Sequence, residues 1–468
     1  MSTCLSWPVS PEPTIPFVAS GCYPVRRGNE VKLHVDGIPA LERLCNAIEN
    51  ARHRVWATIT FMWPEFTMPG GRGTALDVLA DAARRGVDVR LLFWRPDPET
   101  AHHLRNAFWG APDHVKQLES LDAPICVRWD RAHPGFCQHQ KTWLIDAGDT
   151  SGVAVVGGIN LNPHELARPG HRGTDQFHDV NVELTGPCVA DVHHNFVQRW
   201  NEASERHLPD GTWGERGVAS LPFPTNLPAP RGTATIQIQR TTHSGRYQGT
   251  HPAVGGEAYE VSAGEETVYE QYLLAIRSAR RTLYLENQYL DDLEIVRALD
   301  GALRRGVEVA IVAPMVPKRP AKSDSRSTTA FADAFSALGR HPNFTLSGVA
   351  GLTDDGRRTP VYVHSKLMLV DDVWATIGSS NLHRYSLHGN GELNAAIHSP
   401  EFVRATRAAL FGEHLGMDTS GMADVDALRE FHRVAYRNRE RLNGGDHRWQ
   451  GLAYRIAPTE YGTPLLSD

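Results

Sequence analysis

The chain has 468 residues, 41% of them hydrophobic and 22% charged, and its formal net charge is −6. This composition is typical of a globular protein, and no apolar run approaches the ~20 residues that a membrane-spanning helix needs. Proteins that bind nucleic acid usually carry a basic surplus, because their affinity depends on neutralising phosphates. The net charge therefore argues against nucleic acid as the partner.

The N-terminal residues show no basic n-region and no apolar h-region, so we expect no secretory signal. We expect a cytoplasmic protein or one peripherally associated with a membrane, and specialised export stays open. The six cysteines all lie in the first half of the chain and form no C-x-x-C pair. This pattern argues against a disulfide framework and against a cysteine zinc site, and it favours reduced thiols.

Two helix-to-strand passages occur in the first half of the chain and recur in the same order in the second. Residues 47–61 and 275–289 both read as the end of an amphipathic helix followed by an apolar strand. About 25 residues further on, residues 82–93 and 302–312 repeat the pattern, each with Arg-Arg-Gly where the helix should stop. The repeat predicts an α/β fold built from two duplicated α-β-α halves, whose mixed sheets are largely covered on both faces.

A proline-rich stretch separates the two copies. Residues 221–232 contain four prolines, which favour an extended connector and forbid a helix. The predicted organisation is an N-terminal extension (1–20), a first half (21–215), a connector (216–232), a second half (233–420), and a C-terminal helix and tail (421–468).

Each half carries one H-x-K-x-x-x-x-D string followed by a glycine-led turn that ends in asparagine. One such string would be a weak signal, but two at equivalent places in a duplicated chain form a strong one. The candidate catalytic residues are His139, Lys141, Asp146, His364, Lys366 and Asp371, and the candidate phosphate-binding residues are Asn160 and Asn381.

The spacing of the motif predicts a site for a phosphodiester. Residues i and i+2 of a strand point to the same face, so each histidine projects together with its lysine. The lysines and asparagines can hold the non-bridging oxygens, while one imidazole attacks phosphorus and the other protonates the leaving oxygen. Asp146 and Asp371 lie five residues beyond the lysines, on the opposite face of a straight strand. We therefore expect these two aspartates to anchor structure.

Two further features bear on the chemistry. The chain has no H-E-x-x-H string and no carboxylate cluster with metal-ligand spacing, so we expect no metal and no other cofactor. The first turn reads Gly157-Gly158 where the second reads Gly378-Ser379, so the halves need not be chemically equivalent.

The paired motifs resemble the phospholipase D superfamily. The similarity covers roughly residues 20 to 416, and segments 177–187, 285–289 and 413–416 look like those of the lipid-acting members. The resemblance implies a bilobal, pseudo-two-fold fold and a monomer. It also implies hydrolysis of a phospholipid headgroup ester, or its transfer to an alcohol.

The resemblance assigns roles within the site as well. His139 would be the nucleophile that forms a phosphohistidine, and His364 would be the general acid and later the general base. An acidic residue downstream of each motif would orient an imidazole through its second nitrogen. Asp179 is the candidate in the first half and Glu392 in the second.

Three other functions remain open at this stage. A nuclease or other non-lipid phosphodiesterase could use the same scaffold, although the net charge counts against it. A cardiolipin-synthase-type phosphatidyltransferase usually carries N-terminal membrane helices, which this chain lacks. An inactive lipid- or protein-binding relative would normally have lost a motif histidine or lysine, and all four remain. Loop aromatics at 61–66 and 108–109 could contact a membrane, although packing in the pocket or core is the preferred interpretation.

Overall fold

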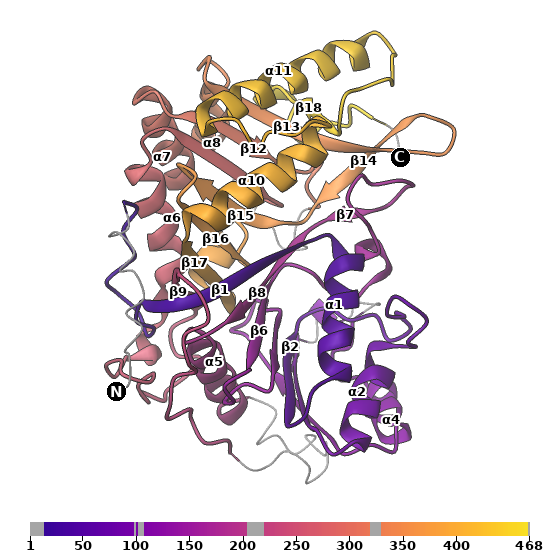
Figure 1. Cartoon of the computed structure of the whole chain (residues 1–468), viewed down its shortest axis with the longest axis vertical. Helices are drawn as coiled ribbons and strands as arrows, with labels where there is room; N and C mark the ends of the chain where they lie inside the picture. Colours follow the sequence, from indigo (N-terminus) through magenta and orange to yellow (C-terminus); the bar gives the residue numbers. More distant parts are fainter. Residues whose placement is uncertain (1–13, 98–99, 102–106, 204–219, 319–328, 467–468) are drawn as a thin grey trace, which may run out of the picture.

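The computed structural model describes residues 14–97, 100–101, 107–203, 220–318 and 329–466. Part of the expected N-terminal extension and part of the expected connector lie outside the described residues. In Figure 1 the first half, indigo to magenta, lies below the second half, which runs from salmon to yellow.

The first half forms a mixed seven-stranded sheet. Its parallel part contains β4, β3 and β2, and antiparallel pairs then add β5, β6, β8 and β1 in that order. The bounds are β1 (Arg26–Val35), β2 (Arg54–Ile59), β3 (Asp88–Trp94), β4 (Ile125–Asp130), β5 (Thr142–Ile145), β6 (Val153–Gly157) and β8 (Val180–Thr185).

The second half repeats this order strand for strand. The parallel strands β13, β12 and β11 are followed by the antiparallel strands β15, β16, β17 and β9. The bounds are β9 (Ala234–Thr242), β11 (Thr282–Asn287), β12 (Glu308–Val312), β13 (Phe344–Leu352), β15 (Lys366–Val370), β16 (Trp374–Gly378) and β17 (Glu392–His398). The prediction of a duplicated α/β fold with mixed sheets is confirmed.

The helices recur in the same way. The first half contributes α1 (Gly37–Glu49), α2 (Ala75–Arg84), α4 (Pro112–Ser120) and α5 (Val189–Asn201). Their counterparts are α6 (Thr267–Ser278), α7 (Leu293–Arg304), α8 (Thr329–Leu338) and α10 (Pro400–Leu415). Helices α2 and α7 both stop at the Arg-Arg-Gly strings, where Gly86 and Gly306 have φ of 91° and 87°. That left-handed backbone favours glycine, which has no Cβ to clash.

The remaining elements extend or join the two copies. Helix α11 (Asp424–Asn443) and β18 (Ala453–Arg455) add to the second half, where β18 pairs with β13. The others are β7 (Phe177–His178), β10 (Glu265–Glu266), β14 (Arg358–Val363), α9 (Arg384–His388) and the 3-10 turns η1 (Pro163–Glu165), η3 (Val261–Ala263) and η4 (Pro458–Glu460).

The halves share a central core, and strands of one half pair with strands of the other. One buried apolar cluster includes Val156 and Val182 of the first sheet together with Ile377 and Leu393 of the second. The opposite faces are covered separately, by α1 and α2 in the first half and by α6, α7 and α8 in the second. Strand β1 pairs with β9, and β7 pairs with β14, so hydrogen bonding continues from one half to the other.

The motif aspartates anchor the backbone in both halves. The carboxylate of Asp146 accepts hydrogen bonds from the backbone N–H groups of Arg52, His53 and Arg54, at the start of β2. The carboxylate of Asp371 accepts them from residues 280–282, at the start of β11. Asp146 itself has φ of 48°, which turns its side chain back toward these donors.

Replacing Asp146 with alanine should destabilise the fold by about 2 kcal/mol, because several backbone donors lose their acceptor together. Specific activity of the folded fraction should stay near that of the parent. Urea unfolding measures the first quantity and a turnover assay the second. Asp122→Ala is the matched control, because Asp122 is exposed but also has a left-handed φ, of 45°. A loss of activity without a loss of stability would place Asp146 in the chemistry instead.

Candidate functional site

Two backbone hydrogen bonds bring the motif histidines to the junction between the halves. The N–H of His139 donates to the carbonyl of Gly391, and the N–H of His364 donates to the carbonyl of His178, each at 2.8 Å. Each histidine therefore lies beside a segment of the opposite half, two or three residues before the strand that follows its motif, β15 or β5.

The predicted orienting acids lie across this junction from the imidazoles. Nδ1 of His139 lies 3.0 Å from Oε2 of Glu392, and Nδ1 of His364 lies 2.6 Å from Oδ2 of Asp179. All four side chains are buried. Asp179 and Glu392 directly follow the carbonyls of His178 and Gly391, so the backbone bridge that fixes each histidine also places its carboxylate.

The Gly158–Ser379 difference between the two turns has a structural cause. A Cβ on Gly158 would lie 2.3 Å from the carboxylate of Asp179, so this position must be glycine for that carboxylate to fit. In the other half, the hydroxyl of Ser379 donates to Oε2 of Glu392 at 2.6 Å. Glu392 therefore has a hydrogen-bond donor that Asp179 lacks.

The two lysines lie in the same buried site. Nζ of Lys141 donates to the carbonyl of His139 at 2.8 Å. Nζ of Lys366 donates to Oε1 of Gln288 at 3.2 Å and also to the carbonyl of His364. Each lysine keeps ammonium donor capacity beyond these contacts, because an ammonium group carries three protons.

Burial makes this a costly place for positive charge. It lowers the pKa of Lys141 to about 7 and that of Lys366 to about 8, with the carboxylates of Glu392 and Asp179 partly opposing the effect. Burial also lowers the pKa of His139, and burial together with Lys366 lowers that of His364 to about 3. A bound anion would therefore stabilise the protonated forms of these lysines and histidines.

Asn160 and Asn381 follow the two turns that contact the acids. Both side chains are 5% exposed, and in the described part of the chain neither Oδ1 has a hydrogen-bond partner. Such orphaned polar groups are rare in protein interiors. Their position after these turns and their unused capacity suit them to a bound polar ligand.

Glu165 is a site residue that the sequence did not reveal. Its carboxyl is fully buried, with Oε1 3.8 Å from Nδ1 of His364 and 3.2 Å from the backbone nitrogen of Asn160. Burial and the nearby carboxylate of Asp179 raise its pKa well above the usual range. It comes from η1, outside both motifs, and it has no counterpart in the second repeat that could have drawn attention to it.

Phe61, of the first aromatic loop, packs into the site. Its ring centroid lies 6.2 Å from that of His139 and 5.8 Å from Nζ of Lys141. Phe108, of the second loop, is buried against Phe93. These contacts favour the pocket-and-core interpretation of the two loops. Across the described residues, no helix is both long enough and apolar enough to cross a bilayer.

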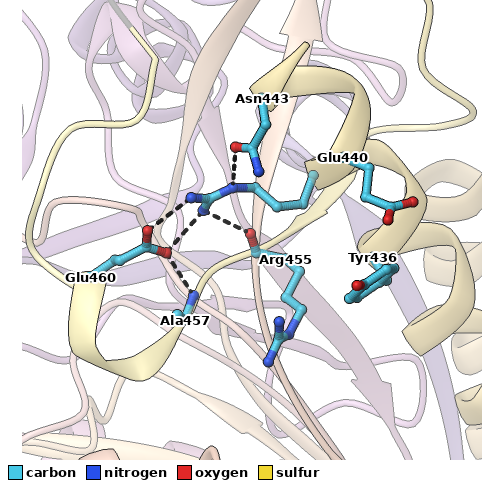
Figure 2. A pocket seen from close by; sticks show the side chains of 7 residues that line it. Tyr436, Glu440, Asn443, Arg455, Ala457 and Glu460 are labelled. Carbon is cyan, nitrogen blue, oxygen red and sulfur yellow. Dashed lines mark hydrogen bonds and ion pairs between the residues drawn. The ribbon is translucent and has the colours of Figure 1, made fainter.

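A separate hollow of about 250 Å³ lies on α11, away from the motif residues. Figure 2 shows it lined by Tyr436, Arg439, Glu440, Asn443, Arg455, Ala457 and Glu460. The guanidinium of Arg439 is bound by both carboxylate oxygens of Glu460, at 2.8 and 3.0 Å. Arg433 pairs likewise with Glu430. Carboxylates within and outside this basic helix therefore pair with several of its arginines, so the helix makes a poor phosphate groove.

Comparison with known proteins gives a consistent result. A family model described as "Cardiolipin synthase, PLD-like domain" matches residues 44–200 and 272–411, which is more than half of the chain. A second model, described as "Phospholipase D", matches residues 167–291.

Similar proteins include phospholipase D alpha 1 of Carica papaya and of Arabidopsis thaliana. Each is 24% identical, and each alignment covers 84% of this chain and 66% of the relative. The chain thus spans about two thirds of the length of these relatives. Among solved structures, a phosphatidylserine synthase of Haemophilus influenzae shares the fold, with a TM-score of 0.52 and 13% identity over 79% of this chain and 82% of that one.

The buried lysines predict a characteristic dependence of stability on pH. Because the pKa of Lys141 is about 7 in the folded chain and near 10.5 when unfolded, the unfolded chain holds an extra proton between these values. The free energy of unfolding should then rise with pH in that window, by up to about 1.4 kcal/mol per pH unit for this group. Lys141→Met should remove this part of the slope and raise stability at pH 7.

Urea unfolding at pH 7, 8 and 9 tests this expectation. Lys116→Met, at a lysine whose side chain is 74% exposed, is the control and should leave the slope unchanged. Equal slopes for the parent and Lys141→Met would mean that the amine stays protonated in the folded state.

Proposed function

The chain belongs to the phospholipase D-like family, and from this membership we propose that it cleaves the headgroup ester of a phospholipid through a covalent phosphohistidine. One observation carries the proposal: two buried imidazoles, each paired with a carboxylate of the opposite half, share a site with two buried lysines. The acceptor of the phosphatidyl group would be water or an alcohol.

In the first step His139 attacks phosphorus through Nε2. Glu392 on Nδ1 keeps the proton on that nitrogen, which leaves the Nε2 lone pair free, and it stabilises the positive charge that develops. The new bond joins Nε2 to phosphorus, and the bond from phosphorus to the headgroup oxygen breaks. Lys141 and Lys366 would hold the non-bridging oxygens as their charge increases, with the amides of Asn160 and Asn381 beside them.

His364 would protonate the departing headgroup oxygen. The carboxylate of Asp179 supports the role of acid, because it lies 2.6 Å from Nδ1 of His364 and would stabilise the imidazolium form. In the free protein the lysines help to lower the pKa of His364. An anionic phosphodiester bound to those lysines would offset this effect and favour the imidazolium.

In the second step the neutral His364 takes a proton from water or an alcohol, whose oxygen attacks the phosphohistidine and releases His139. The intermediate does not retain the first leaving group, so hydrolysis and transfer share one pathway. A phosphatidyltransferase is therefore the second candidate function, and the cardiolipin synthase-like description of the matching family model favours it. A monomer in peripheral contact with the lipid surface would suffice for either reaction.

A lipid substrate is better supported than a nucleic acid. The curated relatives named above are phospholipases D, the chain has a net charge of −6, and the arginines of α11 are largely paired. Incubation with a mixed phospholipid extract, followed by mass spectrometry of the products, tests the substrate class. Release of phosphatidic acid supports the proposal, and cleavage confined to nucleic acid would overturn it.

His139→Ala and His364→Ala should each lower turnover by roughly a thousandfold or more, because nucleophile and acid act on one phosphorus. His193→Ala is the matched control: His193 is a buried histidine of α5 whose ring nitrogens have no hydrogen-bond partner in the described residues. Circular dichroism establishes folding for all three variants. Near-parent activity in a folded His139→Ala or His364→Ala would remove the central claim.

Ethanol should divert product from phosphatidic acid to phosphatidylethanol while lipid consumption changes little. Configuration at phosphorus should be retained, because two in-line displacements each invert it. Inversion at phosphorus would instead indicate direct attack by water and recast His139 as a base.

Glu392→Gln should slow breakdown of the intermediate more than its formation, so rapid-quench labelling should find phosphorylated protein accumulating.

A further inference from the structure

A second group of histidines and carboxylates lies behind the catalytic dyad of His364 and Asp179. Its members are Asp36, His171, His178 and Glu413. The side chains of the first three are 0% exposed and that of Glu413 is 6% exposed. The chemistry proposed above uses none of these four side chains.

The donor atoms of this cluster lie close enough together to bind one ion, since all four lie within 4.8 Å of one another. Nε2 of His171 lies 3.4 Å from Nδ1 of His178, 3.2 Å from Oδ2 of Asp36 and 3.3 Å from Oε1 of Glu413. Nδ1 of His178 lies 3.0 Å from the other carboxylate oxygen of Asp36, Oδ1. For zinc bonds of 2.0–2.2 Å, the edges of a ligand tetrahedron measure about 3.3 to 3.6 Å.

Hydrogen bonding alone leaves His171 poorly satisfied, although Nδ1 of His178 lies 3.0 Å from Asp36 and Oε1 of Glu413 accepts from the backbone N–H of Gly170. A single proton on Nε2 of His171 would face two carboxylates and a second ring nitrogen, all at or beyond the usual limit for an N–H···O bond. Oδ2 of Asp36 and Nδ1 of His171 have no hydrogen-bond partner in the described part of the chain, although both are buried. A cation at the centre would be bound by the lone pairs of the ring nitrogens and carboxylate oxygens that face one another.

The surroundings of His178 match those of a metal-bound imidazole. While Nδ1 faces the cluster, Nε2 lies 3.0 Å from Oε2 of Glu286. Metal-binding histidines commonly donate their other N–H to a carboxylate, which fixes the ring. Glu286 is held in turn by Ser365, Tyr284 and His414 at 2.7, 2.5 and 3.0 Å. Because those partners satisfy Glu286, it is better suited as a support than as a ligand.

The geometry points to a structural zinc site formed by Asp36, His171, His178 and Glu413. Two imidazoles and two carboxylates suit zinc, and a closed set of four protein ligands is typical of a structural site rather than a catalytic one. The ion would join Glu413 of the second half to three ligands of the first. It would also lie behind Asp179, because the N–H of Asp36 donates to the carbonyl of Asp179 at 2.8 Å.

Metal content tests the site without reference to activity. Protein produced in zinc-supplemented medium should contain about one zinc per chain by inductively coupled plasma mass spectrometry. After unfolding in guanidinium with a chelator, refolding with Co²⁺ should give the visible absorption of a tetrahedral cobalt site. Zn²⁺ should raise the Tm of metal-free protein.

Variants of two proposed ligands test where the ion binds. His171→Gln and Glu413→Gln should each lose stoichiometric zinc and the effect of Zn²⁺ on Tm, while His193→Gln, at a buried histidine outside the cluster, should keep both. Wild-type protein that refolds fully without metal and takes up neither zinc nor cobalt would overturn the proposal, whether or not the variants fold. So would zinc retained at full stoichiometry in a folded His171→Gln protein.

Discussion

Two backbone hydrogen bonds between the halves, from His139 to Gly391 and from His364 to His178, determine most of what the site can do. Each places an imidazole next to the residue that follows the accepting carbonyl, and that residue is the carboxylate partner. Neither half can orient its own histidine, because the required acid belongs to the other. The duplication therefore has a functional consequence, since one complete site needs both copies in contact.

This crossed arrangement concentrates charge where water is scarce. Burial opposes protonation of Lys141 and Lys366, and the buried carboxylates only partly offset the cost. The fold holds these groups in place by strand pairing and by the shared apolar core rather than by their mutual attraction. Buried polar sites of this kind generally reduce stability in exchange for function. A bound phosphodiester would add negative charge beside the two lysines and so favour their protonated forms.

Local signals predicted the repeating elements and the motif residues. Arg-Arg-Gly ended helices at Gly86 and Gly306. The expectation that each histidine and its lysine share a strand was not met, because β15 begins at Lys366, after His364, and β5 begins at Thr142, after both His139 and Lys141. The pairing of Asp179 with the histidine of the other half was beyond such signals, because residues about 185 apart meet only through the docking of the halves. Glu165 was missed for the same reason, since nothing in its own segment indicates that it will be buried beside His364.

Metal-binding motifs in a sequence have a related limit. Short spacings such as H-E-x-x-H report only ligands supplied by one helix or loop. The cluster at Asp36, His171, His178 and Glu413 draws on three separated stretches of the chain, and one of them lies in the other half. A ligand set assembled by tertiary structure leaves no local pattern, so the sequence supports the absence of a motif but not the absence of a site.

The two-fold scaffold also supports chemistry that is not two-fold. The proposed nucleophile and acid need different environments, although they come from equivalent strands. Ser379 gives Glu392 a hydroxyl donor, whereas Gly158 only makes room for Asp179, and Glu165 adds a second carboxyl near His364 alone. These differences fall on the turns and on η1 rather than on the paired strands. Divergence could thus separate the two roles without disturbing the backbone bridges on which both histidines depend.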